Sequence, residues 1–177
     1  MKTFSGIGKQ TALEIVKRGG TVHMVCRNKV TAGEAQQELM EASGNSNVHL
    51  HVLDISRPRD VAEFVKKFGE ENSKLDVLIN NAGCMVNTRE TNPEGLDVNF
   101  ATNTLGTFML TEGLIPLLEQ SDQPRVLTVS SGGMLVQKLE AEDLQFSKVR
   151  DSFILLSGGE MFVIVSEVFT VIKLLYH

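Results

Sequence analysis

Apolar residues along the chain change repeatedly between a helical spacing of about 3.6 and the short apolar runs that are typical of buried strands. Helical spacing is found in four segments, residues 7–18, 32–41, 57–68 and 96–118. Strand-like runs occupy residues 21–26, 48–53, 77–79 and 125–129. This alternation predicts βαβ units, and therefore an α/β fold with a parallel sheet and helices on both of its faces.

A glycine-rich turn precedes the first helix, but no strand-like run precedes that turn. In a doubly wound sheet of the Rossmann type, this turn follows the first, central strand. We therefore expect a Rossmann-type, doubly wound parallel sheet that lacks its first strand and the region after its fifth strand.

Composition and charge exclude several classes of function. The 177 residues are 42% hydrophobic and 22% charged, as in soluble globular domains, and the net charge of −5 without a basic run argues against a nucleic-acid partner. Two cysteines, Cys26 and Cys84, are too few for a disulfide framework and fit a reducing compartment. The four histidines lack zinc-site spacing, so no metal is expected, and His49 and His51, on one face of a strand, are interpreted as packing residues.

The two ends of the chain bear on its location. Residues 1–9 contain no apolar core of a signal peptide, which indicates a cytoplasmic protein. Residues 161–176 form the longest apolar region, but Glu167 near its centre would cost about 2.5–3.5 kcal/mol in a membrane. Ser157 and Glu160 have capping-box spacing, which predicts an apolar helix that packs on the sheet or on a partner. Contact with a membrane surface is the less favoured alternative.

The segment Ser5-Gly6-Ile7-Gly8 opens the first predicted helix. Glycines at such a turn let backbone N–H groups approach a pyrophosphate, although two glycines before a helix are often only a turn. About twenty positions on, at the end of the next strand, the residue that would bind the adenosine ribose is Arg27 and not an acid. An arginine suits a 2′-phosphate, which favours NADP(H) over NAD(H). The alternative is that Arg27 is only a solvated residue at a strand end.

Further motifs follow in order, and together they resemble the short-chain dehydrogenase/reductase family. Residues 80–83, Asn-Asn-Ala-Gly after the strand at 77–79, resemble the family's N-N-A-G motif, and Leu53-Asp54 resembles its adenine-contacting strand end. Residues 103–108 resemble the N-x-x-G-x-F segment of the retinol-dehydrogenase-like branch. Residues 125–131 resemble the strand that ends in the family's active-site serine. The resemblance extends from Gly6 to about Leu139.

The resemblance implies an oxidoreductase that binds NADP(H) and acts on a small-molecule carbonyl or alcohol. The residues implied for the cofactor are Ser5, Gly6, Ile7 and Gly8 at the pyrophosphate, Arg27 at the ribose phosphate, Asp54 and Ile55 at the adenine, and Asn81, Ala82 and Gly83 beneath the cofactor. The implied catalytic residues are Asn103, which would hold the water of a proton relay, and Ser131, which would hydrogen-bond the substrate carbonyl. Turn roles for Asn80 and Asn81, and a flexible loop at residues 130–133, are the alternatives.

The sequence also departs from the family pattern. Lys2 stands where the family has its first glycine, and the Y-x-x-x-K motif is absent, because Tyr176 is the one tyrosine and no lysine lies four residues after it. We therefore expect an incomplete NAD(P)-binding domain over residues 1–139, a divergent tail over residues 140–177, and impaired catalysis. Two alternatives to an enzyme are a non-catalytic dinucleotide-binding or interaction protein and an unstable truncated isoform. A homo-oligomer is also left open.

Overall fold

The computed structural model describes residues 6–86, 88–130 and 141–144. The chain divides into two compact units, an N-terminal unit, Met1–Asp54, and a C-terminal unit, Ile55–His177. Ser5, Ser131 and the tail helix expected after Ser157 lie outside the described residues. The domain boundary expected at residue 139 also lies outside them. The roles of Ser5 and Ser131, the tail helix and this boundary therefore remain predictions.

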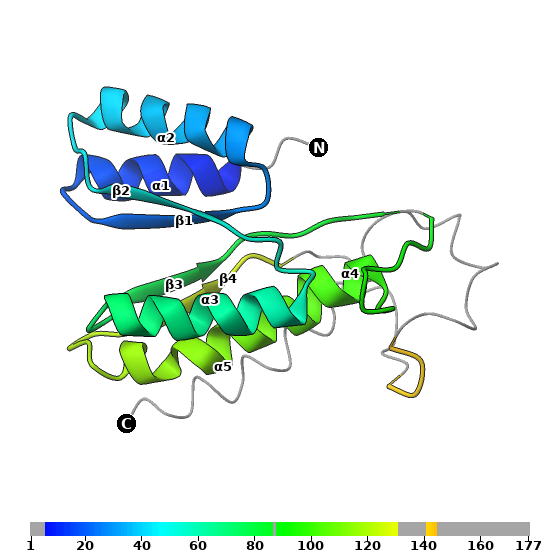
Figure 1. The fold of residues 1–177 in the computed structure, drawn as a ribbon. Coiled ribbons are helices and arrows are strands. Elements are labelled where there is room, and N and C mark those ends of the chain that lie inside the picture. The colour runs from blue at the N-terminus through cyan, green and yellow to red at the C-terminus, as the bar shows by residue number, and fades with distance from the viewer. Residues whose placement is uncertain (1–5, 87, 131–140, 145–177) are drawn as a thin grey trace. The chain divides into compact units, whose positions relative to one another are not determined.

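The N-terminal unit is a two-stranded parallel sheet with two helices on one face (Figure 1). Its elements are α1 (Ile7–Lys17), β1 (Val22–Cys26), α2 (Lys29–Ser43) and β2 (Val48–Val52). The strands are in register from Val22 opposite Val48 to Cys26 opposite Val52. Helix α2 begins after Asn28, whose side-chain oxygen accepts hydrogen bonds from the N–H groups of Val30 and Thr31.

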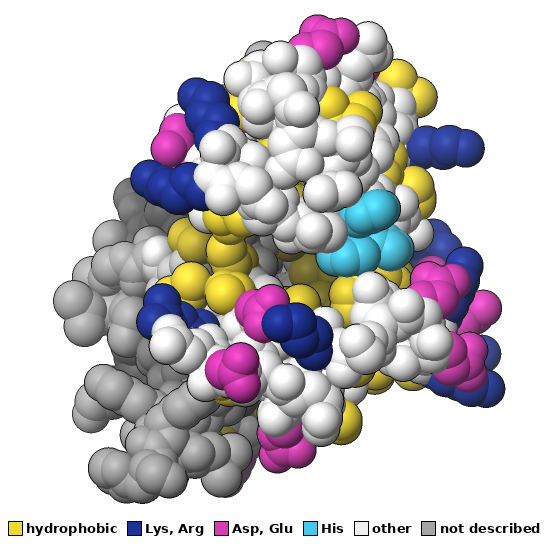
Figure 2. Space-filling model, turned by 90° about the vertical axis from the view of Figure 1, so that its left-hand side faces the viewer, with side chains coloured by type: hydrophobic (Ala, Val, Ile, Leu, Met, Phe, Trp, Pro, Cys, Tyr) yellow, Lys and Arg dark blue, Asp and Glu magenta, His cyan; other side chains and the backbone are white. Residues whose placement is uncertain are grey.

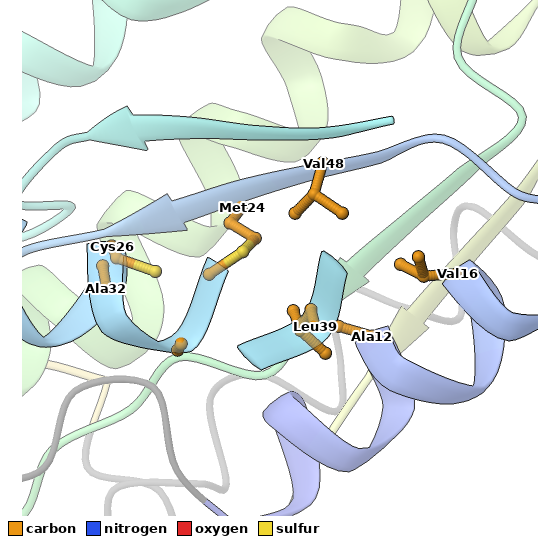
Figure 3. Close-up of a cluster of buried hydrophobic side chains, with 8 residues drawn as sticks. Ala12, Val16, Met24, Cys26, Ala32, Leu39 and Val48 are labelled. Carbon is orange, nitrogen blue, oxygen red and sulfur yellow. The ribbon is translucent and has the colours of Figure 1, made fainter. Parts of the chain in front are cut away.

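One face of this sheet forms the core of the unit, because alternate residues of a strand point to the same side. Met24 and Cys26 of β1 and Val48 of β2 are buried there (Figure 3). Their neighbours are small and branched residues of the two helices, Ala12 and Val16 of α1 and Ala32, Ala35 and Leu39 of α2. The other face carries the intervening residues, which include the histidines of both strands.

The C-terminal unit has a second two-stranded parallel sheet and two helices that pack side by side, α3 and α5 (Figure 1). Its elements are α3 (Pro58–Glu71), β3 (Val77–Asn80), α4 (Val98–Phe100), the π-helical turn η1 (Ala101–Gly106), α5 (Thr107–Leu118) and β4 (Arg125–Thr128). Strand β3 pairs with β4 from Val77 opposite Arg125 to Asn80 opposite Thr128. Helices α3 and α5 approach closely at Gly113, where an added Cβ would lie 2.5 Å from the Val65 side chain.

The helices and strands predicted from the sequence are confirmed, and so is the α/β fold with parallel strands. One feature differs from expectation. The helical region expected over residues 96–118 is interrupted by the π-helical turn η1. The described strands form two parallel pairs, β1 with β2 and β3 with β4.

Candidate functional site

Helix α1 begins directly after Gly6, which has φ 69°, a left-handed conformation that favours glycine. Within the described residues no side chain caps this helix end, and both Gly6 and Ile7 are exposed. Among the described residues, the N–H groups of the first turn therefore have no side-chain cap, as an anion-binding helix end requires. Gly8 lies in this first turn and is half-buried.

Arg27 directly follows β1, and its side chain is exposed. The next residues are Asn28, the cap of α2, and Lys29, a second exposed cation at the start of that helix. The carboxyl end of β1 therefore combines two cations with a helix N-terminus, a combination that favours negative charge. Arg27 was predicted from the sequence as a site residue, whereas Lys29 was not.

Of the two asparagines in the N-N-A-G motif, the first has a structural role. Asn80 is buried, and its Nδ2 donates to Thr111 Oγ1 at 3.1 Å and to Thr128 Oγ1 at 3.4 Å. These bonds connect the end of β3 to α5 and to β4. The following Asn81 is half-buried, and Ala82 and Gly83 are exposed, so these three residues are accessible beyond the carboxyl end of β3.

Asn103, expected from the resemblance to be catalytic, lies inside η1 and is 3% exposed. Its Oδ1 accepts the N–H of Cys84 at 2.8 Å, and its Nδ2 donates to the carbonyl of Cys84, also at 2.8 Å. Both ends of the side-chain amide are thus engaged with the backbone that follows Gly83. The geometry makes Asn103 a residue that fixes this segment. π-Helical turns of this kind are frequent at functional sites.

The loop after β2 contains Ile55, which is expected at the adenine and is buried at 8% exposure. A Cβ on Gly106 would lie 2.1 Å from the carbonyl oxygen of Ile55, so η1 and this loop are in direct backbone contact. The next carbonyl, that of Ser56, accepts a hydrogen bond from Asn92 Nδ2 at 2.6 Å. The glycine of the N-x-x-G segment is therefore required because no side chain fits between the two backbones. Asp54, expected at the adenine with Ile55, is half-buried at the end of the N-terminal unit.

Asn92 and Asn99 were not predicted from the sequence. Asn99 Oδ1 accepts the N–H of Val86 at 2.8 Å, and Asn99 Nδ2 donates to the carbonyl of Val86 at 3.0 Å. One signal could have indicated Asn99: it lies four residues before Asn103, and so on the same helical face. No such local signal exists for Asn92.

Three histidines lie on one face of the β1–β2 sheet, and Figure 2 shows histidine side chains gathered at the surface. The rings of His23 and His49 stack with centroids 4.8 Å apart, and His23 Nδ1 lies 3.0 Å from His51 Nε2. Burial lowers the pKa of His23, with smaller contributions from the other two histidines. Among the described residues, no three His, Cys, Asp or Glu side chains are arranged to hold a metal ion.

The structure also bears on membrane contact. No helix in the described part of the chain is both long and apolar enough to cross a membrane. The apolar segment at residues 161–176 lies outside that part.

Comparison with known proteins gives consistent matches. The model of the family described as short chain dehydrogenase matches residues 3–141. Human dehydrogenase/reductase SDR family member 12 is 61% identical over 141 residues, which are 80% of this chain and 44% of that protein. Retinol dehydrogenase 12 of Mus musculus is 37% identical over 144 residues, 81% of this chain and 46% of that protein. The chain thus spans less than half the length of these relatives.

Solved structures support the same fold. The structure described as a Pseudomonas aeruginosa RhlG/NADP active-site complex is 25% identical, with a TM-score of 0.62 over 82% of this chain and 58% of that chain. The resemblance of residues 103–108 to the retinol-dehydrogenase-like branch is confirmed by the identities to both relatives.

Proposed function

The chain belongs to the short-chain dehydrogenase family, and from this premise we propose that it binds a nicotinamide dinucleotide, with NADP(H) preferred to NAD(H). The proposal rests on the position of three motif residues, each of which follows the carboxyl end of a strand. Arg27 follows β1, Asp54 lies two residues after β2, and Asn81 follows β3. In open α/β sheets, ligands bind outside the carboxyl ends of the parallel strands.

Both units contain residues of the family's cofactor-binding motifs. In the N-terminal unit, the first turn of α1 with Gly6, Ile7 and Gly8 would receive the pyrophosphate, with Ser5 preceding it. The exposed guanidinium of Arg27 would bind the 2′-phosphate. In the C-terminal unit, Asn81, Ala82 and Gly83 are accessible for contact with the cofactor beyond the end of β3.

The preference for NADP(H) is tested by competitive binding of NADPH and NADH to the wild type and to Arg27→Asp. Loss of a charge-assisted hydrogen bond is worth about 1.5–3 kcal/mol, so NADPH should bind the variant about 10- to 100-fold more weakly. NADH should be little affected. Arg18→Asp is a matched control, because it makes the same charge change on an exposed arginine at the end of α1. Equal affinities for the two cofactors in both wild type and Arg27→Asp would exclude the assignment.

We propose that the chemistry is hydride transfer between the nicotinamide and a small carbonyl or alcohol, as expected for an oxidoreductase of this family. Ser131 is proposed to hydrogen-bond the carbonyl oxygen, while Asn103 maintains the backbone next to the reacting centre through its bonds to Cys84. Bound NADP(H) would supply the hydride.

A second candidate function is dinucleotide binding without efficient turnover. It is favoured by one observation: within these 177 residues no tyrosine is followed four positions later by a lysine. Without that pair, neither Asn103 nor Ser131 readily provides a proton at neutral pH, because amides and hydroxyls are not acids in that range. We propose that the chain alone is catalytically impaired.

A further inference from the structure

The segment after Gly83 is held to a helical region by two asparagines in the same way. Asn103 makes two hydrogen bonds of 2.8 Å with the N–H and carbonyl of Cys84. Asn99 makes two hydrogen bonds of 2.8 and 3.0 Å with the N–H and carbonyl of Val86. We refer to these four bonds as the asparagine clamp.

The two asparagines lie four residues apart in the helical region, and so on one face of it. Each side-chain amide offers an acceptor oxygen and a donor N–H₂ group, which pair with the N–H and the carbonyl of one backbone residue. Together they therefore hold Cys84 and Val86, which are two positions apart.

The side chains of the clamped segment differ in their exposure. The Cys84 side chain lies against the helical region, with Sγ 3.8 Å from the carbonyl oxygen of Val98, and the residue is 7% exposed. Met85 lies between the two clamped residues and is 52% exposed. Cys84 is thus buried against the helical region, whereas the Met85 side chain is accessible to a ligand.

We propose that Asn99 is a positioning residue, which together with Asn103 holds residues 84–86 so that Met85 contacts the nicotinamide end of a bound dinucleotide. The inference rests on the proposed cofactor function. The segment continues Asn81, Ala82 and Gly83 beyond the carboxyl end of β3, where ligands of such sheets bind. Strands β3 and β4 form the parallel pair of the C-terminal unit. By family membership they correspond to the fourth and fifth strands of a Rossmann-type sheet, in its second mononucleotide-binding half, and we assign this half to the nicotinamide end.

The test compares two ligands that differ at the nicotinamide end. NADPH carries the nicotinamide ribose, whereas adenosine 2′,5′-bisphosphate carries only the adenosine half with its 2′-phosphate. Dissociation constants are measured for the wild type, Met85→Ala and Asn99→Ala, with Thr88→Ala as a control on an exposed residue of the same loop. Amide hydrogen exchange of residues 84 and 86 is followed in the same proteins.

Met85→Ala and Asn99→Ala should each weaken NADPH binding by about 3- to 10-fold, the range expected for loss of a partly buried apolar contact. Binding of adenosine 2′,5′-bisphosphate should not change. Asn99→Ala should accelerate exchange at the Val86 N–H while the Cys84 N–H stays protected by Asn103. Met85→Ala should leave both exchange rates as in the wild type.

Several outcomes would overturn the proposal. A uniform loss of affinity for both ligands in Asn99→Ala would mean that Asn99 stabilises the unit without positioning a ligand contact. Unchanged exchange at Val86 would exclude the clamp itself. A wild type that binds neither ligand would refute the proposed cofactor function and the contact of Met85 with it. The exchange measurement would still decide whether the clamp exists.

Discussion

Nδ1 of His23 on β1 lies 3.0 Å from Nε2 of His51 on β2, so that two imidazole rings are hydrogen-bonded across the parallel strand pair. One ring must donate and the other accept, which requires at least one neutral imidazole. Burial of His23, and then the proximity of His49 and His51, lower the pKa of His23 below its ordinary value of 6.5.

This cluster predicts a loss of stability in acid. The unfolded chain binds a proton at His23 near pH 6.5, whereas the folded chain binds it only at a lower pH. The unfolded state therefore holds more protons below pH 6.5, and the free energy of unfolding falls as the pH decreases from about 6.5 toward the folded-state pKa. Urea unfolding between about pH 5 and 8 should show this fall in the wild type and a shallower one in His23→Gln. Identical slopes in both proteins would contradict the prediction.

Gly106→Ala should strongly destabilise the C-terminal unit, because the new Cβ would lie 2.1 Å from the carbonyl oxygen of Ile55, a backbone atom. Overpacking costs about 1–3 kcal/mol, and we expect the upper end of this range or more. Gly69→Ala in α3 is the matched control, since nothing lies within 4 Å of an added Cβ there. That control should stabilise the protein by about 0.5–1 kcal/mol. Equal unfolding free energies for the two variants would refute the close contact.

Substitution of the first asparagine of the N-N-A-G motif should lower the stability of the protein, whereas substitution of the second should weaken cofactor binding. Asn80→Ala removes hydrogen bonds to Thr111 and Thr128 in a buried site, which should lower the free energy of unfolding by about 1–3 kcal/mol. Asn81→Ala changes a half-buried residue, so it should weaken NADPH binding with less than about 1 kcal/mol of lost stability. Denaturant unfolding and ligand binding measured on both variants check the assignment. A reversed pattern would mean that the roles are exchanged.

Both cysteines should resist thiol reagents in the native protein. Cys26 and Cys84 are 3% and 7% exposed, and burial raises the pKa of the Cys26 thiol to about 11. The thiolate is the reactive form of a cysteine. With a pKa of about 11, the Cys26 thiol is almost entirely protonated at pH 8. Mass spectrometry after mild alkylation should find both residues unmodified, and both modified once urea is added. Rapid labelling of Cys26 without denaturant would show that the core of the N-terminal unit is open.

The purified chain should show little dehydrogenase activity with aldehydes, ketones or retinoids. The Y-x-x-x-K pair is absent from this sequence, and loss of a positioned general acid removes a factor of about 10²–10⁴ in rate. Oxidation of NADPH is the measurement, with Ser131→Ala as the control. A rate close to that of ordinary enzymes, abolished by Ser131→Ala, would show a competent site and require another proton donor.

The sequence by itself determined the local structure and the positions of the motif residues at the strand ends. Apolar periodicity depends only on neighbouring residues, so it predicted both α1 and β1, with Gly6 before the helix and Arg27 after the strand. The membership in the short-chain dehydrogenase family could also be inferred, because its motifs are short and ordered along the chain.

Only the tertiary structure decided how these segments are held. The bonds of Asn103 to Cys84, of Asn92 to Ser56 and the contact of Gly106 with Ile55 join residues that are distant along the chain. The apolar periodicity of the sequence does not indicate such pairs, because each pair depends on the path of a loop in the folded structure. The same holds for Asn80 and Asn81, identical neighbours in sequence, of which one is buried against α5 and β4 and the other is left accessible. Burial and hydrogen-bond partners, which give each asparagine its role, arise only when the chain has folded.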